Sequence, residues 1–388
     1  MQAFILIAIL LTVLYVSLLI YYRFAFTAIP QFQTTNAKSP NTTISIIIPA
    51  RNEELNIENC LQSILQNTYP THLLEIIVVD DHSKDGTADI VKKYASQNVK
   101  LISLSDHIST KINSYKKKAI EIAVAQASGT LIITTDADCI VPPKWLQTIA
   151  AFYKEKKPAF IAASVAIDCG LSFIQIFQSL DFMTLQGITA AVVNKKQMTM
   201  CNGANMAYER AAFYEVGGFA GIDNIASGDD MLLMHKIYKR YPERVLFLKA
   251  KDAIVRTAPV NTIKEFFNQR IRWASKADKY DDKRILPVLA LVYFFNVIMF
   301  AIPIIAIFYN APILLLNTQY SILSLWLWML AFKIAAELFF LFPVAAFFNK
   351  KDMLWFFPLL QPFHICYTII AGWLGKFGKY SWKERNVQ

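Results

Sequence analysis

Charged residues are scarce in this chain of 388 residues, and its few cysteines are scattered. Charged side chains make up 18% of the sequence against 55% hydrophobic ones, and the mean hydropathy is +0.35. This composition excludes an ordinary soluble enzyme, and the charge that remains excludes a pure bundle of membrane helices, so we expect both kinds of domain. The five cysteines form no C-x-x-C pair, which favours reduced cysteines that serve mainly in packing.

Charge is absent altogether from residues 3–22, which are long enough to cross the hydrocarbon layer as one helix. A cleaved signal peptide is the alternative interpretation. Against it, no basic residue precedes the apolar stretch, and the first charge, Arg23, follows it. We therefore predict an N-terminal transmembrane anchor over residues 1–23, with its following end in the cytoplasm.

The last part of the chain, residues 286–377, is predicted to be a C-terminal membrane region. Residues 286–309 and 320–347 each have the length and composition of a spanning helix. Residues 353–377 are basic on both flanks, so either this segment is interfacial or re-entrant or the positive-inside tendency fails here. These flanks account for the net charge of +10, and because no nucleic-acid-binding module accompanies them, we expect no nucleic-acid partner.

The middle of the chain, residues 40–280, alternates between strand and helix patterns. Apolar, β-branched runs predict strands at 44–48, 75–79, 99–104 and 130–135, and helical patterns lie between them at 53–67, 86–97 and 115–128. This alternation predicts a mainly parallel sheet, in which ligands bind at the carboxyl ends of the strands.

Acidic residues follow two of these strands. Asp80 and Asp81 close the second strand, where carboxylates accept hydrogen bonds from a base and from ribose hydroxyls; a turn that caps the next helix is the alternative. Asp136 and Asp138 close a later strand. Two carboxylates one residue apart at a strand end can meet Mg²⁺ or Mn²⁺ that also contacts phosphate oxygens, and such an ion neutralises a departing diphosphate.

A further acidic pair, Asp229 and Asp230, precedes a helical pattern. One aspartate suits the cap of that helix. The other is placed to accept a proton from an acceptor hydroxyl, since a general base must be held still to be useful. The pair therefore predicts a helix start and a catalytic base together.

Residues 269–273 spell Q-x-x-R-W, immediately before a basic hinge that includes Lys276 and Lys279 and before the long apolar run. Two guanidiniums, Arg270 and Arg272, suit a diphosphate, and the indole of Trp273 offers a face on which a sugar ring stacks. The alternative is that Trp273 only packs the domain against the membrane region.

Together these motifs resemble the inverting family-two glycosyltransferases, in the Q-x-x-R-W branch related to cellulose, chitin and hyaluronan synthases. The matching segments occur in family order: IIIPARNEE at 46–54, VVDDHSKDGT at 78–87, SYKKKAI at 114–120, TTDADC at 134–139, NGANMAY at 202–208, Asp229-Asp230 and Gln269–Trp273. The resemblance implies an α/β, Rossmann-like glycosyltransferase A-type domain with a mainly parallel sheet, plus N-terminal and C-terminal transmembrane helices.

The resemblance also implies a role for each matched residue. The donor would be bound by Pro49, Arg51, Glu53, Asp80, Asp81, Lys116, Lys117, Asp136, Arg270 and Arg272. The acceptor side would be formed by Asn205, Asp229, Gln269 and Trp273. Asp136 and Asp138 would hold Mg²⁺ or Mn²⁺, and Asp230 would be the catalytic base.

We therefore expect a multi-pass inner-membrane glycosyltransferase with a cytoplasmic catalytic domain. It would transfer a hexosyl or N-acetylhexosaminyl group from a nucleotide-diphospho-sugar, in the first place a UDP-sugar. The acceptor would be either a lipid that receives one sugar or a growing polysaccharide, and export of the polysaccharide would need a homo-oligomer or a partner. A non-catalytic scaffold subunit of an envelope polysaccharide assembly is the alternative from another class, and the intact acidic and Q-x-x-R-W motifs argue against it.

Overall fold

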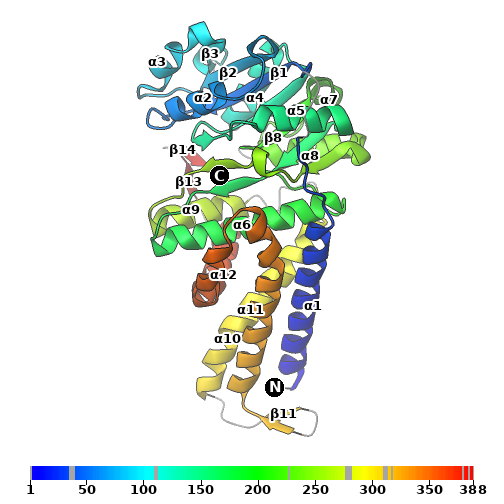
Figure 1. Cartoon of the computed structure of the whole chain (residues 1–388). Helices are drawn as coiled ribbons and strands as arrows, with labels where there is room; N and C mark the ends of the chain where they lie inside the picture. Colours follow the sequence, from blue (N-terminus) through cyan, green and yellow to red (C-terminus); the bar gives the residue numbers. More distant parts are fainter. Residues whose placement is uncertain are drawn as a thin grey trace.

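The computed structural model of the chain describes residues 2–34, 40–108, 112–225, 228–275, 282–308, 313–315, 318–377, 380–382 and 385–387. A sheet domain lies at one end of the molecule and a group of long helices at the other, with crosswise helices between them (Figure 1).

The main sheet has seven strands in the order β3 (Val99–Ser103), β2 (Leu74–Asp80), β1 (Ile44–Ala50), β4 (Leu131–Thr134), β8 (Met206–Glu209), β6 (Phe160–Ala163) and β9 (Val245–Leu248). The first four strands are parallel, β8 is antiparallel to both of its neighbours, and β9 is parallel to β6. A smaller sheet has three strands in the order β5 (Cys139–Ile140), β10 (Val255–Thr257) and β7 (Val165–Ile167). The predicted α/β fold with a mainly parallel sheet is confirmed.

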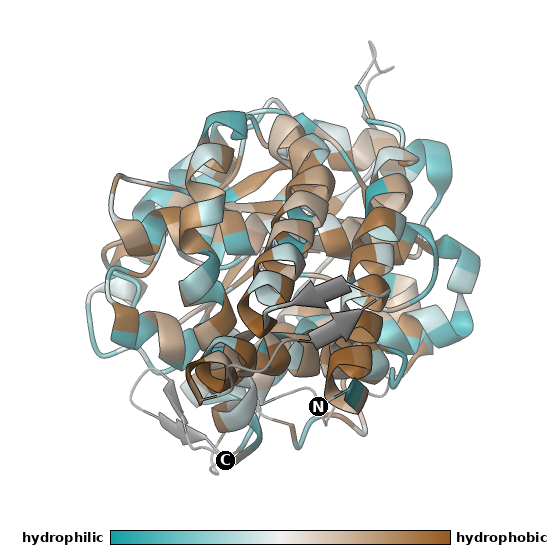
Figure 2. Cartoon of the chain, turned by 90° about the horizontal axis from the view of Figure 1, so that it is seen from below, coloured by the Kyte–Doolittle hydropathy of each residue, from teal (hydrophilic) through white to brown (hydrophobic). Residues whose placement is uncertain are grey.

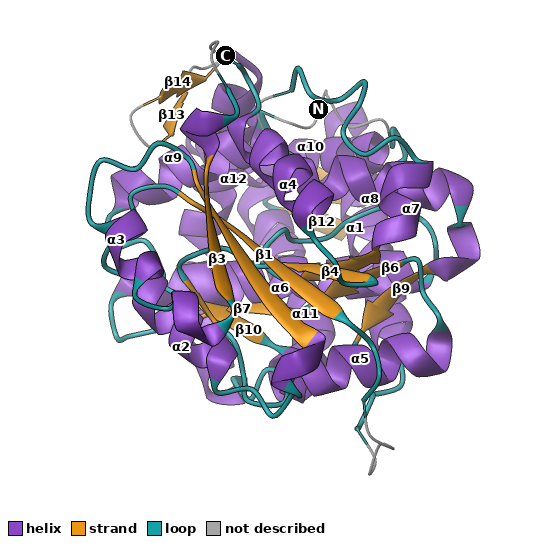
Figure 3. Ribbon diagram, turned by 90° about the horizontal axis from the view of Figure 1, so that it is seen from above, coloured by secondary structure: helices purple, strands orange, loops and turns teal. Residues whose placement is uncertain are grey.

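Helices cover both faces of the main sheet, because its central strands are apolar on both sides (Figure 3). Ile46 and Ile48 pack into the same core as α2, whereas Ile47 packs into the opposite core with α4. The helices of this domain are α2 (Ile57–Leu65), α3 (Thr87–Lys92), α4 (Tyr115–Gln126), α5 (Trp145–Lys156), α7 (Arg210–Glu215) and α8 (Asp229–Arg240). The predicted strands and helices between residues 44 and 128 are all present, with ends shifted by a few residues.

Two helices, α6 (Phe173–Asn194) and α9 (Ile263–Ala274), lie crosswise between the sheet domain and the long helices (Figure 1). α6 is long and apolar enough to cross a membrane, but 72% of its most apolar stretch is buried inside the protein. It contacts β7 and β9 on one side and α1 and α11 on the other, so it forms a core shared by both parts of the molecule. The sequence analysis assigned no element to residues 173–194, so α6 is a finding of the structure.

Three helices, α1 (Gln2–Thr27), α10 (Ile285–Phe308) and α11 (Ile322–Phe347), pack against one another and are called the long-helix bundle below. Each is long and apolar enough to cross a membrane, as predicted, and the hydropathy colours of Figure 2 show mostly hydrophobic residues at this end of the molecule. Lys249 joins the bundle to the sheet domain, because its Nζ donates to the carbonyl oxygens of Phe26 at 2.9 Å and Ile29 at 3.0 Å. These carbonyls lie at and beyond the end of α1, where backbone acceptors lack helical partners.

Residues 351–377 form a 3-10 helix, η7 (Lys351–Leu360), and then α12 (Gln361–Phe377). α12 packs against α9 and α10, and η7 packs against α11 and α6. This segment therefore lies beside the crosswise helices (Figure 1). Two short hairpins complete the described chain, β11 (Ile313–Leu315) with β12 (Thr318–Tyr320) and β13 (Tyr380–Trp382) with β14 (Arg385–Val387).

Candidate active site

The predicted acidic residues meet at the carboxyl edge of the main sheet, because three neighbouring parallel strands end there. Ala50 of β1 lies beside Asp80 of β2, and Ile47 of β1 lies beside Thr134 of β4. Pro49 is the penultimate residue of β1. Parallel strands bring their following loops together, which places segments distant in sequence around one site.

The loops after β1 and β2 are joined by hydrogen bonds. The Asn52 N–H donates to Ser83 Oγ at 2.9 Å, and the Glu53 N–H donates to Thr87 Oγ1 at 2.8 Å. The Glu53 carboxylate accepts from the side chain of Asn56. Asn52 (φ 51°) and His82 (φ 56°) adopt left-handed backbone conformations, which are uncommon outside glycine and concentrate at functional loops.

Two buried aspartates face these loops. Asp81 is 3.9 Å from Arg51 Nη1 and 2.9 Å from His82 Nδ1, and Arg51 also donates to the Asp81 carbonyl oxygen at 2.8 Å. Asp80 Oδ2 accepts from the Ser83 N–H at 3.4 Å. Asp80 Oδ1 is buried and has no hydrogen-bond partner in the part of the chain that the structure describes. A buried acceptor without a donor costs free energy, so a ligand that supplies the donor would be bound favourably.

Lys116 lies between the acidic residues of three segments. Its Nζ is 2.7 Å from Asp136 Oδ1 and 3.5 Å from Asp229 Oδ2. Burial alone would lower the pKa of Lys116, but the Asp136 and Asp229 carboxylates raise it above its ordinary value. A fixed positive charge thus stands at the point where the sheet edge meets the start of α8.

Gly203 lets these charged groups approach the backbone. A Cβ at this position would lie 3.3 Å from Asp229 Oδ2 and 3.4 Å from Lys116 Nζ, which is tighter than ordinary contact. The Gly203 N–H donates to Asp230 Oδ2 at 3.2 Å, and the Met231 N–H donates to Asp230 Oδ1 at 2.8 Å. Both carboxylate oxygens of Asp230 therefore accept backbone hydrogen bonds at the N-terminus of α8, where the helix dipole favours negative charge.

Asp138 lies next to this group and is fixed by the smaller sheet. Its Oδ2 accepts from Thr257 Oγ1 at 3.3 Å. Asp136 and Asp138 are both partly exposed. No cluster of three or more metal-binding side chains occurs among the described residues, so an ion held by these two carboxylates would take its remaining ligands from substrate and water.

Two of the predicted contacts are not supported by the structure. Lys117 is buried, and its Nζ donates to the carbonyl oxygens of Ile222 and Ile225, each at 2.7 Å, so Lys116 is the lysine that faces the site. Asn205 is fully buried and hydrogen-bonded through both ends of its amide to Trp145 and to two backbone carbonyls. The side chain of Asn205 therefore fixes the core beneath the loop, with its amide engaged inside the protein.

The Q-x-x-R-W residues lie on the last turns of α9. Arg270 is buried, and its Nη2 is 2.8 Å from Asp181 Oδ2 on α6. Contact of Arg270 with the diphosphate of the sugar donor stays a prediction, and in the structure the guanidinium pairs with Asp181. Trp273 is half-buried, and the centre of its ring lies 5.9 Å from the centre of the Phe182 ring. The Gln269 Oε1 atom is buried without a hydrogen-bond partner in the described chain, whereas Arg272 is half-buried near the helix end.

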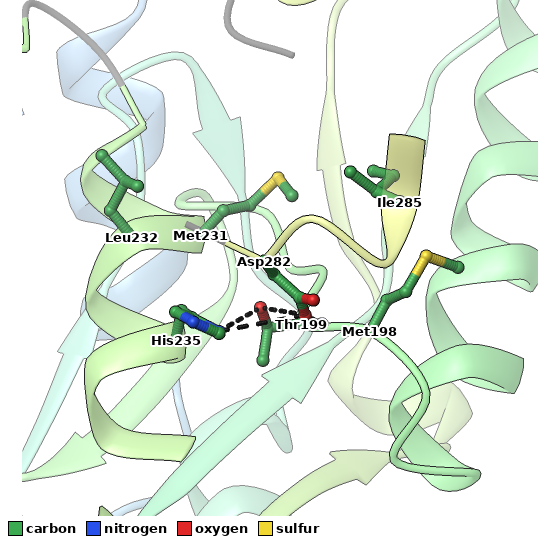
Figure 4. A pocket seen from close by; sticks show the side chains of 7 residues that line it. All are labelled: Met198, Thr199, Met231, Leu232, His235, Asp282 and Ile285. Atoms are coloured by element: carbon green, nitrogen blue, oxygen red, sulfur yellow. Dashed lines mark hydrogen bonds and ion pairs between the residues drawn. The ribbon is translucent and has the colours of Figure 1, made fainter. Parts of the chain in front are cut away.

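A small polar cluster joins His235 of α8 to the segment that leads into α10 (Figure 4). Thr199 Oγ1 is 3.2 Å from His235 Nδ1 and donates to Asp282 Oδ2 at 3.1 Å. Arg284 binds both oxygens of Asp282, each at 2.7 Å. The cavity beside the cluster has about 10 Å³, which is room for one water molecule, so the cluster fixes the chain and offers no substrate pocket. The predicted hinge residues Lys276 and Lys279 lie outside the described residues.

Sequence patterns missed three residues of this region: Gly203, Thr257 and Asp181. Gly203 stands inside a recognised motif, so its neighbours gave a signal. No sequence pattern pointed to Thr257 or Asp181, because their partners, Asp138 and Arg270, are distant in the sequence and are brought close only by the fold.

The order of this sheet, with acidic residues at the carboxyl ends of its parallel strands, is that of a glycosyltransferase A-type fold. Residues 45–217 match the model of glycosyl transferase family 2, so the chain carries a domain of that family and is a glycosyltransferase. This finding confirms the enzyme prediction and argues against the scaffold alternative.

Individual relatives agree. The chain is 27% identical over 326 residues to the probable glycosyltransferase YdaM of Bacillus subtilis, covering 78% of this chain and 74% of the relative. It is 26% identical to an N-acetylglucosaminyltransferase of Rhizobium meliloti, covering 61% and 55%. The fold is similar to that of the mannosyltransferase PcManGT from Pyrobaculum calidifontis in complex with GDP-Man and Mn²⁺, at 20% identity and a TM-score of 0.58, over 96% of this chain and 98% of the other.

Proposed function

We propose that the protein is a membrane-bound inverting glycosyltransferase that moves a sugar from a nucleotide-diphospho-sugar to a lipid or polysaccharide acceptor in cell-envelope glycan or glycolipid synthesis. The observation that carries this proposal is the meeting of Lys116, Asp136, Asp229 and Asp230 around Gly203. One positive group for phosphate and one fixed carboxylate for an acceptor hydroxyl are the two charges that the transfer needs.

Asp230 is the proposed catalytic base. Backbone N–H groups hold both of its oxygens, yet a carboxylate has about four acceptor positions, so it retains the capacity to take a proton. The acceptor oxygen would lose its proton to Asp230 and attack the anomeric carbon, while the bond from that carbon to the diphosphate oxygen breaks. This single displacement inverts the anomeric centre, and no covalent enzyme intermediate is needed.

The nucleoside would lie over the ends of β1 and β2. The buried Asp80 Oδ1 atom is placed to accept from the donor nucleotide, and Asp81 is fixed by Arg51 to line the same loop. Lys116 would neutralise phosphate charge beside Asp136. We propose a UDP-sugar with a hexosyl or N-acetylhexosaminyl group; the N-acetylglucosaminyltransferase relative supports the second of these.

Asp136 and Asp138 fit a divalent cation, since both carboxylates are partly exposed and Asp136 already attracts one positive charge at 2.7 Å. When bound there, Mg²⁺ or Mn²⁺ would supply charge neutralisation for the departing diphosphate. The complex of PcManGT with GDP-Man and Mn²⁺ supports this assignment.

The acceptor would reach the site from the membrane side. α9 carries the Q-x-x-R-W residues and lies between the sheet domain and the long-helix bundle, beside α12. Trp355 is 85% exposed and Leu359 is 77% exposed on η7, and residues 351–376 are long and apolar enough to cross a membrane, which supports contact of this segment with lipid, either at the interface or within the membrane. We propose that the bundle spans the inner membrane with the catalytic domain in the cytoplasm, and that export of a polysaccharide would require a homo-oligomer or a partner.

The proposal is tested with the full chain, purified and placed in lipid. A panel of UDP- and GDP-sugars is offered with lipid extracts, and products are detected by mass. The Asp230→Asn variant should bind the donor but form no product, whereas Asp223→Asn, a change at an exposed aspartate of the preceding loop, should behave like the parent. Product formation by Asp230→Asn at the parental rate would contradict the assignment of the base.

A further inference from the structure

Asp181 is a buried carboxylate in an otherwise uncharged helix. It is the single charged residue among the 22 of α6, and burial of an unpaired carboxylate would be strongly unfavourable. Its Oδ1 accepts from Tyr367 Oη at 2.7 Å, and its Oδ2 lies 2.8 Å from Arg270 Nη2. Three helices, α6, α9 and α12, therefore meet at one carboxylate.

The ion pair extends to the indole of the Q-x-x-R-W segment. The Arg270 guanidinium lies 4.3 Å from the centre of the Trp273 ring and 4.9 Å from that of Phe266. The indole also packs against Phe182, the residue that follows Asp181 on α6. Asp181 thus holds the guanidinium, and the guanidinium and Phe182 together hold Trp273, because a cation over an aromatic face is an attractive and directional contact.

The opposite partner of Asp181, Tyr367, leads into the long-helix bundle. One turn before Tyr367, His364 Nδ1 lies 3.4 Å from Lys333 Nζ. Lys333 is fully buried and pairs with Glu337 at 2.6 Å. Glu337 in turn accepts from Tyr15 of α1 at 2.5 Å. Polar groups inside such apolar helices are expensive and mark functional or orienting contacts.

We infer that Asp181 is a positioning residue for the proposed transfer, which holds the Q-x-x-R-W segment against α6, and that Tyr367 ties this segment to the membrane helices. The inference rests on the proposed function only for its kinetic consequence. Its structural content is that the place of Trp273 depends on the Asp181 carboxylate and on the Tyr367 hydroxyl, and that both act through Arg270 and the packing of the helices.

Four variants of the full chain in lipid test this role. Asp181→Asn keeps the size of the side chain and removes its charge, and Tyr367→Phe removes one hydroxyl. Thr184→Val on α6 and Cys366→Ala on α12 are the controls, because the Thr184 hydroxyl donates to a carbonyl of its own helix and Cys366 is a free, partly buried cysteine next to Tyr367 in the sequence. Incorporated 5-fluorotryptophan, with the Trp273 signal assigned by Trp273→Phe, reports the indole environment by ¹⁹F NMR without any need for activity.

We expect the Trp273 signal to shift or broaden in Asp181→Asn and in Tyr367→Phe, and to stay in place in both controls. Transfer should fall by about ten- to a hundredfold in Asp181→Asn through kcat or the acceptor KM, while donor affinity changes little. An unchanged Trp273 signal in both test variants would overturn the inference. If the parent transfers no sugar while the Trp273 signal still shifts in Asp181→Asn and Tyr367→Phe, the proposed function is refuted and the positioning role is supported.

Discussion

Replacement of Asn205 by alanine decides whether this residue contacts the acceptor or holds the core. In the structure the Asn205 side chain is fully buried, Trp145 Nε1 donates to its Oδ1 at 3.0 Å, and its Nδ2 donates to the carbonyl oxygens of Ser164 at 2.7 Å and Ala253 at 2.8 Å. The Ser164 oxygen keeps a second donor, the Val255 N–H at 3.2 Å. The main cost of Asn205→Ala therefore falls on the Trp145 N–H and the Ala253 carbonyl.

Each buried polar group that loses its partner costs about 1–3 kcal/mol, so Asn205→Ala should destabilise the domain by about 3–4 kcal/mol. In a chain of this size we expect a lower Tm by about 5–10 °C. Asn202→Ala on the same loop is the matched control, because it removes one contact, the hydrogen bond from the Ala204 N–H at 2.9 Å. Its expected cost is about 1 kcal/mol.

The assay is thermal unfolding in detergent at one scan rate, followed by acceptor and donor KM values at a temperature where both variants stay folded. Folded Asn205→Ala should keep the parental KM for the acceptor, since the amide of the side chain is engaged inside the protein. If the variant instead unfolds at the parental Tm and only the acceptor KM rises, the structural account of Asn205 is refuted and the direct acceptor contact is right.

Three further predictions concern the metal, the nucleotide and the entry into α10. EDTA should abolish transfer, Mn²⁺ or Mg²⁺ should restore it, and Asp138→Asn should stay folded but inactive; full activity in chelator would refute the metal assignment. Asp80→Ala should weaken nucleotide affinity, measured by calorimetry, with an unchanged Tm, and the reverse pattern would remove Asp80 from the nucleotide site. For Asp282, burial alone would raise the pKa, but hydrogen bonds from Arg284 and Thr199 lower it to about 2. Because this folded-state pKa lies below the unfolded value, the stabilisation from the Asp282 carboxylate is present above about pH 4 and is lost as pH falls toward 2. Tm measured from pH 5 to 3 should fall less in Asp282→Asn than in the parent, and equal slopes would contradict the account.

Much of the fold could be predicted because its signals are local. The run Ile44–Ala50 is apolar and β-branched, and such runs form strands that are buried on both faces. Asp80 and Asp136 follow strands in the sequence, so they had to lie at the carboxyl edge of a parallel sheet. The sequence predicts a long apolar helix over residues 286–309, because length and hydrophobicity can be judged without knowledge of the neighbouring elements.

The sequence by itself therefore determined the class of domain, the edge at which the acidic residues lie, and the presence of long apolar helices. Only the tertiary structure decided that Lys116 and not Lys117 faces Asp136, that Asn205 is enclosed in the core, and that Arg270 pairs with Asp181. The physical reason is that strand and helix formation depend on near neighbours in the chain, whereas the partner of a buried amide or charge depends on which distant elements pack against it. Lysines one position apart on a helix point about 100° apart, so the packing of α4 alone decides which of them meets the carboxylates.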